Sequence, residues 1–179
     1  MEVVMNKLNG NRSLKLSISG MLIALGVILS TFYIPFGVAK CFPIQHFINV
    51  IGAVLLGPVY AVINAFLISL IRNMLGMGSL LAFPGSMIGA ALAGLLYQRF
   101  SGQQFIGHRM ACLGEVVGTG VVGGIIAALM ASYLMGNRVG LLFFIIPFGI
   151  SSLIGSIFSL IIFEATDVIK RLRRWTEKI

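Results

Sequence analysis

Six long apolar segments, separated by polar or Gly/Pro-containing interruptions, fill this sequence from Leu14 to Ala165. In a chain of 179 residues with 58% hydrophobic and 10% charged residues, they leave little material for a water-soluble domain. A hydrocarbon core about 30 Å thick requires about 20 apolar residues per helical crossing. We therefore predict an all-α integral membrane protein, a bundle of six transmembrane helices at Leu14–Ile34, Pro43–Leu56, Pro58–Leu75, Ala82–Phe100, Met110–Leu134 and Leu141–Ala165.

The expected organisation is a tail over residues 1–13, one six-helix domain over residues 14–165 and a basic tail over residues 166–179. A single kinked helix across Gly57 and Pro58 is the main topological alternative, because proline bends membrane helices without always ending them. Residues 43–75 would then extend for about 50 Å, well beyond one hydrocarbon core. Two helices joined by a tight turn fit better.

Basic residues are distributed unevenly between the two ends of the predicted helices. Six crossings place both termini on one side, and ten of the thirteen Lys and Arg residues then share that side: Lys7, Arg12, Lys15, Arg99, Arg109, Lys170, Arg171, Arg173, Arg174 and Lys178. Only Lys40, Arg72 and Arg138 lie on the other side. The positive-inside rule then predicts a multi-pass protein with cytoplasmic termini, and we expect it in the plasma membrane. Cations at the ends of spans favour contact with anionic lipid over nucleic-acid binding.

The sequence contains no motif for covalent chemistry or for ATP hydrolysis. It has neither the G-x-x-x-x-G-K-[ST] phosphate loop nor the H-E-x-x-H zinc motif. Its two histidines, His46 and His108, fall at opposite ends of the predicted bundle, which argues against a histidine-based metal site. We predict a protein that is not an enzyme, holds no cofactor, and binds and moves a small molecule.

Polar residues inside the spans gather at the predicted outer side. Gln45, His46 and Asn49 share one face at the start of the second span, because residues three and four apart are neighbours on a helix. Arg72 and Asn73 end the third span, and Ser86 begins the fourth. Intramembrane polar groups usually face the bundle interior and mark a ligand path. These side chains suit a small heteroaromatic ligand with a hydroxyl group, although a hydrated helix end remains the simpler explanation.

Cations and aromatic rings lie near the same side. Lys40 lies in one loop and Arg72 leads into another, and these loops could cover an outward pocket; the alternative is that both cations anchor helix ends at the interface. Tyr33 and Phe83 are the aromatic residues best placed to stack on a flat ligand, whereas an ordinary interfacial aromatic belt is the alternative.

Glu115 is the only acidic residue well inside a predicted span. Thr119 and several glycines surround it, so it should face a closely packed neighbour and not lipid. Three roles are open. Glu115 could bind substrate if the fifth span begins deeper in the membrane than drawn here. It could instead pair with an arginine at the cytoplasmic end, or couple the chain to a partner subunit.

Small residues spaced four apart allow helices to approach closely in a membrane. Most such rows fit packing within the bundle. The exception is the first span, where Gly20 and Ala24 form a smooth face suited to a partner subunit.

Five sequence segments together resemble the ThiW family of thiazole-type substrate-binding S components of energy-coupling factor (ECF) vitamin transporters. The junction Leu56–Leu70 is similar to S components in general, and four segments are more specific: Val38–Val50, Ser69–Asn73, Leu81–Ala90 and Gly114–Gly120. The resemblance covers nearly the whole chain apart from its first dozen residues and its basic tail.

The resemblance implies a six-helix subunit that captures hydroxyethylthiazole, a thiamine precursor, from outside. It implies association with a transmembrane T component and two cytoplasmic ATPases, whose ATP hydrolysis drives reorientation and release inside. In these transporters small residues of the first helix contact the T component, and Gly20 and Ala24 are the matching positions. Ala61 departs mildly, because related sequences often have Gly there.

Two other functions stay open on the residues alone. An autonomous secondary transporter would need a midplane ion site, for which Glu115 is the one weak candidate. A noncatalytic membrane scaffold would use the small-residue faces and have no pocket.

Overall fold

The structure is a computed structural model that describes residues 11–36, 39–136, 139–140 and 142–176, with residues 39, 104 and 167–176 described by backbone alone. Lys7 and Arg138, both used above to predict orientation, lie outside these residues, as do the side chains of the tail cations.

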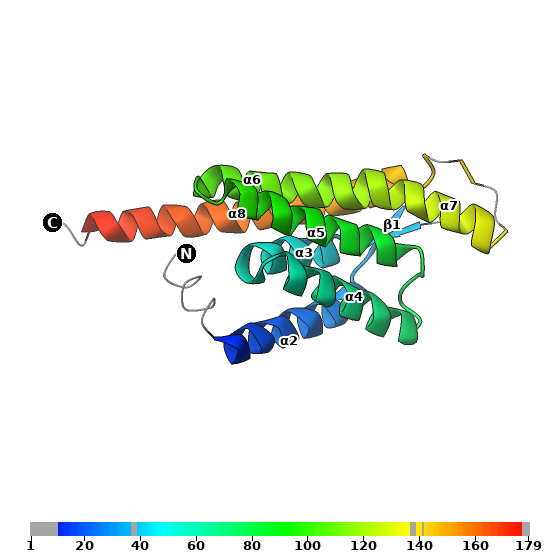
Figure 1. Cartoon of the computed structure of the whole chain (residues 1–179), viewed down its shortest axis with the longest axis horizontal. Coiled ribbons are helices and arrows are strands. Elements are labelled where there is room, and N and C mark those ends of the chain that lie inside the picture. The colour runs from blue at the N-terminus through cyan, green and yellow to red at the C-terminus, as the bar shows by residue number, and fades with distance from the viewer. Residues whose placement is uncertain (1–10, 37–38, 137–138, 141, 177–179) are drawn as a thin grey trace.

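The residues that the structure describes form an antiparallel bundle of six helical rods (Figure 1). In chain order these are α2 (Arg12–Ile28) with the 3₁₀ turn η1 (Leu29–Thr31), α3 (Pro43–Leu56), α4 (Pro58–Met74), α5 (Ala82–Phe100), a long rod and α8 (Ile145–Thr176). The long rod consists of α6 (Gln104–Glu115), the π-helical stretch η2 (Val116–Gly123) and α7 (Gly124–Leu134).

The connections divide between the two ends of the bundle. The beginning of α2, the α3–α4 and α5–α6 turns and the end of α8 lie at one end (Figure 1). The chain segments between η1 and α3, between α4 and α5 and between α7 and α8 lie at the other end. We call the second end the hairpin end, because it carries two short antiparallel strands, β1 (Ile34–Phe36) and β2 (Ala39–Cys41), in which Ile34 lies opposite Cys41.

The prediction of two helices on either side of Gly57 is confirmed. Gly57 has a φ of +89°, a left-handed value that favours glycine, and Pro58 opens α4 at a position where a proline needs no N–H partner. These adjacent residues end one helix and begin the next.

Four predicted helix ends are wrong: one in the first helix, one in the fifth and two in the sixth. The first helix ends at Ile28, and Ile34 belongs to a strand instead. The fifth begins at Gln104, six residues before Met110, and the sixth runs from Ile145 to Thr176. Hydropathy locates apolar stretches, whereas Gln, Lys and Arg continue a helix readily beyond them.

Alanines and glycines bring the central helices into close contact. Ala53, Ala61, Ala65, Ala90 and Ala93 are fully buried in the core. A Cβ atom at Gly118 would lie 2.7 Å from the Cα atom of Gly89, so η2 lies directly against the backbone of α5. The predicted small-residue rows therefore pack within the bundle, apart from the row on α2. There Gly20 and Ala24 are exposed, and a Cβ atom at Gly20 would contact nothing within 4 Å.

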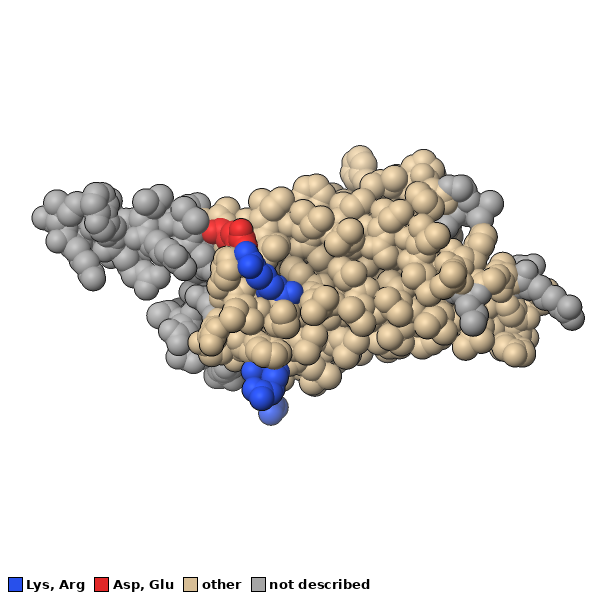
Figure 2. Space-filling view, turned by 90° about the horizontal axis from the view of Figure 1, so that it is seen from above, with Lys and Arg blue, Asp and Glu red and all other residues tan. Residues whose placement is uncertain are grey.

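The outer surface of the bundle is apolar, as expected of an all-α membrane protein. In the described part of the chain, three helical stretches are long and apolar enough to cross a bilayer: Arg12–Thr31, Phe105–Leu134 and Ile145–Thr166. The apolar helices α3 and α4 are shorter, with 14 and 17 residues. On the face shown in Figure 2, the described Lys and Arg side chains gather toward one end, and most of the other described surface is uncharged.

Candidate functional site

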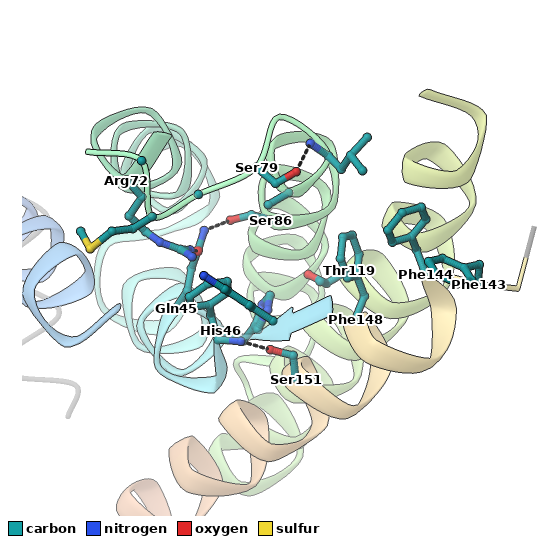
Figure 3. A pocket seen from close by; sticks show the side chains of 17 residues that line it. Gln45, His46, Arg72, Ser79, Ser86, Thr119, Phe143, Phe144, Phe148 and Ser151 are labelled. Atoms are coloured by element: carbon teal, nitrogen blue, oxygen red, sulfur yellow. Dashed lines mark hydrogen bonds between the residues drawn. The ribbon is translucent and has the colours of Figure 1, made fainter. Parts of the chain in front are cut away.

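A cavity of about 400 Å³ opens at the hairpin end, between α3, α4, α5, η2 and α8. This volume lies within the usual range for small-molecule pockets. Its wall combines polar and aromatic side chains (Figure 3): Lys40, Phe42, Gln45, His46, Arg72, Gly76, Met77, Gly78, Ser79, Leu81, Ala82, Ser86, Thr119, Phe143, Phe144, Phe148 and Ser151.

The polar face of α3 forms one side of this site. Gln45, His46 and Asn49 are 2%, 8% and 1% exposed, as expected from their shared helical face. The Gln45 side-chain amide donates to the Ser69 hydroxyl at 3.0 Å and to the Ser86 hydroxyl at 2.7 Å. The Asn49 amide donates to the Ser86 carbonyl oxygen at 3.2 Å. These hydrogen bonds tie α3 to α4 and α5 and fix the positions of both amides.

Glu115 is fully buried at the end of α6 and connects three side chains. Its Oε1 atom lies 2.8 Å from Nδ1 of His46, and it accepts hydrogen bonds from the Asn49 amide at 3.0 Å and the Thr119 hydroxyl at 3.0 Å. An ionised carboxylate only accepts hydrogen bonds, so beside an ionised Glu115 the Nδ1 atom of His46 carries the hydrogen. In that tautomer the Nε2 atom of a neutral His46 is an acceptor, and His46 is one of the residues that line the cavity.

Glu115 lies deep in the bundle because α6 begins earlier in the sequence than predicted. Because the helix begins at Gln104, Glu115 lies eleven residues inside the rod, at the start of the π-helical stretch. Such stretches often occur at functional sites. The alternative that Glu115 pairs with an arginine at the other end is wrong: Arg109 lies 3.3 Å from Glu164, on α8, and Glu115 contacts His46.

Arg72 is the most buried cation among the described side chains, at 1% exposure. Its Nη1 atom donates to Oε1 of Gln45, and its guanidinium carbon lies 3.8 Å from the centre of the Phe42 ring. The Nε and Nη2 atoms of Arg72 have no hydrogen-bond partner among the described residues.

The hairpin and the loop after α4 cover the cavity on the side of Arg72. The Lys40 ammonium lies 4.6 Å from the centre of the Tyr33 ring, a cation–π contact. The Asn73 amide donates to the Ser69 carbonyl at 2.8 Å and to the Ser79 carbonyl at 3.3 Å. Asn73 therefore holds the loop that contributes Gly76 to Ser79 to the wall.

The predicted site residues occupy three positions relative to the cavity. Lys40, Gln45, His46, Arg72 and Ser86 line it. Asn49 and Glu115 lie behind the lining and hold it by hydrogen bonds. Tyr33, Asn73 and Phe83 do not line it: Tyr33 supports Lys40, Asn73 holds the loop, and Phe83 packs edge-on against Phe66.

The sequence did not reveal the part of the cavity wall that comes from the beginning of α8 and the residues just before it. Phe143, Phe144 and Phe148 line the cavity, and the Ser151 hydroxyl accepts a 2.8 Å hydrogen bond from the backbone N–H of Phe42. The aromatic cluster at the beginning of the sixth apolar segment was the available signal, but hydropathy treats it as ordinary membrane surface. Within the described residues, no cluster of three His, Cys, Asp or Glu side chains could hold a metal ion.

Comparison with known proteins identifies the family. No curated protein and no solved structure shows significant similarity to this chain. A family model described as the thiamine-precursor transporter protein ThiW matches residues 16–168, so the chain belongs to the ThiW family of thiamine-precursor transporters.

Proposed function

We propose that this chain is the substrate-binding S component of an ECF-type importer that captures a thiamine precursor, hydroxyethylthiazole, from outside the cell. The observation that carries the proposal is a cavity of about 400 Å³ with a buried polar network, in a chain of a thiamine-precursor transporter family. Serine hydroxyls, the Gln45 amide and the Nε2 atom of His46 can bind a hydroxyl group and ring heteroatoms, and three phenylalanines suit a flat ring.

The proposed orientation has six membrane crossings with both termini in the cytoplasm. The beginning of α2 and the end of α8 lie at the end of the bundle that carries Arg12, Lys15, Arg99 and Arg109. The positive-inside rule favours the cytoplasm for that end. The cavity, at the hairpin end, would then face outside in the plasma membrane.

The proposed partners are a transmembrane T component and two ATPases, which supply the energy of transport. The chain has no phosphate-loop motif of its own. The exposed face of α2 around Gly20 and Ala24 would allow a partner helix to approach closely.

Ligand binding by the purified chain tests the proposal. Calorimetry should show saturable binding of hydroxyethylthiazole, and Asn49→Ala should weaken it about tenfold, because Asn49 positions both Ser86 and Glu115. Asn11→Ala, at the exposed cap of α2, is the matched control and should bind normally. Unchanged affinity in Asn49→Ala, Gln45→Ala and His46→Ala would exclude this cavity as the site.

An autonomous secondary transporter is the second candidate, favoured by the buried contact between His46 and Glu115, which could carry a proton. Uptake in cells with and without the T component and ATPases separates the two functions. Uptake that persists without them and stops on addition of a protonophore would support the second candidate and contradict the first.

A further inference from the structure

The Arg72 guanidinium is a buried cation with an incomplete set of partners. It is 1% exposed and lines the cavity, and within the residues that the structure describes only Nη1 of its three nitrogens has an acceptor. Unpaired donors on a buried charge are costly unless an acceptor reaches them. Nε and Nη2 share one edge of the planar guanidinium, and this edge suits side-on binding of two oxygens of a carboxylate or phosphate.

A second cation belongs to the same wall. The Lys40 ammonium lies 4.6 Å from the Tyr33 ring centre, the Tyr33 and Phe42 ring centres are 5.9 Å apart, and the Arg72 guanidinium carbon lies 3.8 Å from the Phe42 ring centre. This ladder of two cations and two rings places both positive charges on the hairpin side of the cavity. Neither cation forms an ion pair with a carboxylate in the described part of the chain.

Negative charge near the cavity is limited. Glu115 is the one buried acidic side chain among the described residues, and it lies behind the lining, where one of its oxygens already accepts three contacts. Two cations therefore line the cavity against one carboxylate behind it. Electrostatic attraction is stronger in a low-dielectric interior than in water, so an anionic group beside Arg72 would be strongly favoured.

Building on the proposed function, we propose that this site prefers thiazole precursors that carry an anionic oxygen group, a phosphate monoester or a carboxylate, over neutral hydroxyethylthiazole. Nε and Nη2 of Arg72 bind two oxygens of this group, and Lys40 contributes a second positive charge. Figure 3 shows Arg72 and the phenylalanines Phe144 and Phe148 on opposite sides of the cavity. The ligand therefore lies with its anionic group toward Arg72 and its ring toward the phenylalanines.

Calorimetry on the full chain in phosphatidylcholine nanodiscs tests this assignment with three ligands that share a thiazole ring. They are hydroxyethylthiazole, its phosphate monoester and the analogue with an acetate side chain. At least one anionic ligand should bind about tenfold or more tightly than the neutral one, and the two anionic ligands distinguish phosphate from carboxylate. Added salt should reduce the preference.

Substitutions then test which residues cause the preference for an anionic ligand. Arg72→Gln should bring the ratio of anionic to neutral affinity close to one, and Arg72→Lys should lower it by losing the side-on edge while keeping the charge. Lys40 lies on the hairpin, outside the helical core, so Lys40→Gln can be measured even if Arg72→Gln does not fold. It should also lower the ratio of anionic to neutral affinity. Arg109→Gln, in an exposed pair with Glu164, should leave it unchanged.

The outcomes separate this inference from the proposed function. If neutral hydroxyethylthiazole binds as tightly as both anionic ligands, or more tightly, the anionic assignment is overturned and the proposed function stands. If the anionic preference survives both Arg72→Gln and Lys40→Gln, the assignment to this wall is overturned. If none of the three ligands binds, both the proposed function and this inference fail.

Discussion

At the scale of single residues, Glu115 is the side chain on which most of the polar network depends. One of its oxygens contacts His46 and Asn49 of α3 and Thr119 of η2. Glu115→Gln keeps the size of the side chain but removes its charge, and hydrogen bonds to a charged acceptor are the stronger kind. We expect a lower melting temperature and ligand binding weakened about tenfold, measured by thermal unfolding and calorimetry on the same preparation.

Glu164→Gln is the matched control for this prediction. Glu164 contacts Arg109 at 3.3 Å, with side chains 42% and 51% exposed, and such pairs contribute less than about 1 kcal/mol. The control should bind ligand normally and melt close to the parent protein. Equal effects of the two substitutions would show that the Glu115 contacts do not organise the site.

Cys41 gives a second prediction at this scale. Its thiol is 1% exposed and donates to the Pro147 carbonyl oxygen at 3.3 Å, and burial raises its pKa above the ordinary value. Because the thiolate is the reactive form, a raised pKa lowers the reactive fraction at any given pH. Maleimide should therefore label Cys41 slowly at pH 8 in the folded protein and rapidly in detergent that unfolds it, as read by mass spectrometry. Rapid labelling of the folded protein would contradict the burial of this hairpin residue.

At the scale of elements, the contact between η2 and α5 depends on the absence of side chains. A Cβ atom at Gly118 would lie 2.7 Å from the Gly89 Cα atom, so Gly118→Ala should separate two backbones and cost about 1–3 kcal/mol, the usual range for overpacking. Gly20→Ala on α2 meets open space and should be neutral or slightly stabilising through helix propensity. Thermal unfolding of the isolated chain compares them. The contact is not tight if Gly118→Ala melts as high as Gly20→Ala.

The elements also show what the sequence could and could not predict. Apolar length predicted the helical rods, and residue spacing predicted that Gln45, His46 and Asn49 would share a buried face, because both depend on local periodicity. The hairpin and the π-helical stretch were missed, since each depends on contacts between distant segments, such as that of Cys41 with Pro147. The contact of Glu115 with His46 joins residues 69 positions apart and leaves no local pattern.

At the scale of the whole molecule, the orientation in the membrane determines which side the cavity faces. Two exposed glycines with open space around them mark the two ends of the bundle: Gly102 in the α5–α6 turn and Gly140 in the segment between α7 and α8. Cys41 and Cys112 are free and buried, so they contribute little background to cysteine labelling. Single Gly102→Cys and Gly140→Cys variants are therefore a matched pair for topology.

With a membrane-impermeant maleimide on intact cells, Gly140→Cys should be labelled and Gly102→Cys should not, until the membrane is opened. The reason is that Arg99 and Arg109 flank Gly102, and positive charge is retained on the cytoplasmic side. The reverse pattern would place the cavity opening in the cytoplasm, where a precursor arriving from outside could not reach it directly. Such a result would favour export, or binding of a cytoplasmic molecule, over capture of a precursor from outside. The contacts within the cavity would be the same in either orientation.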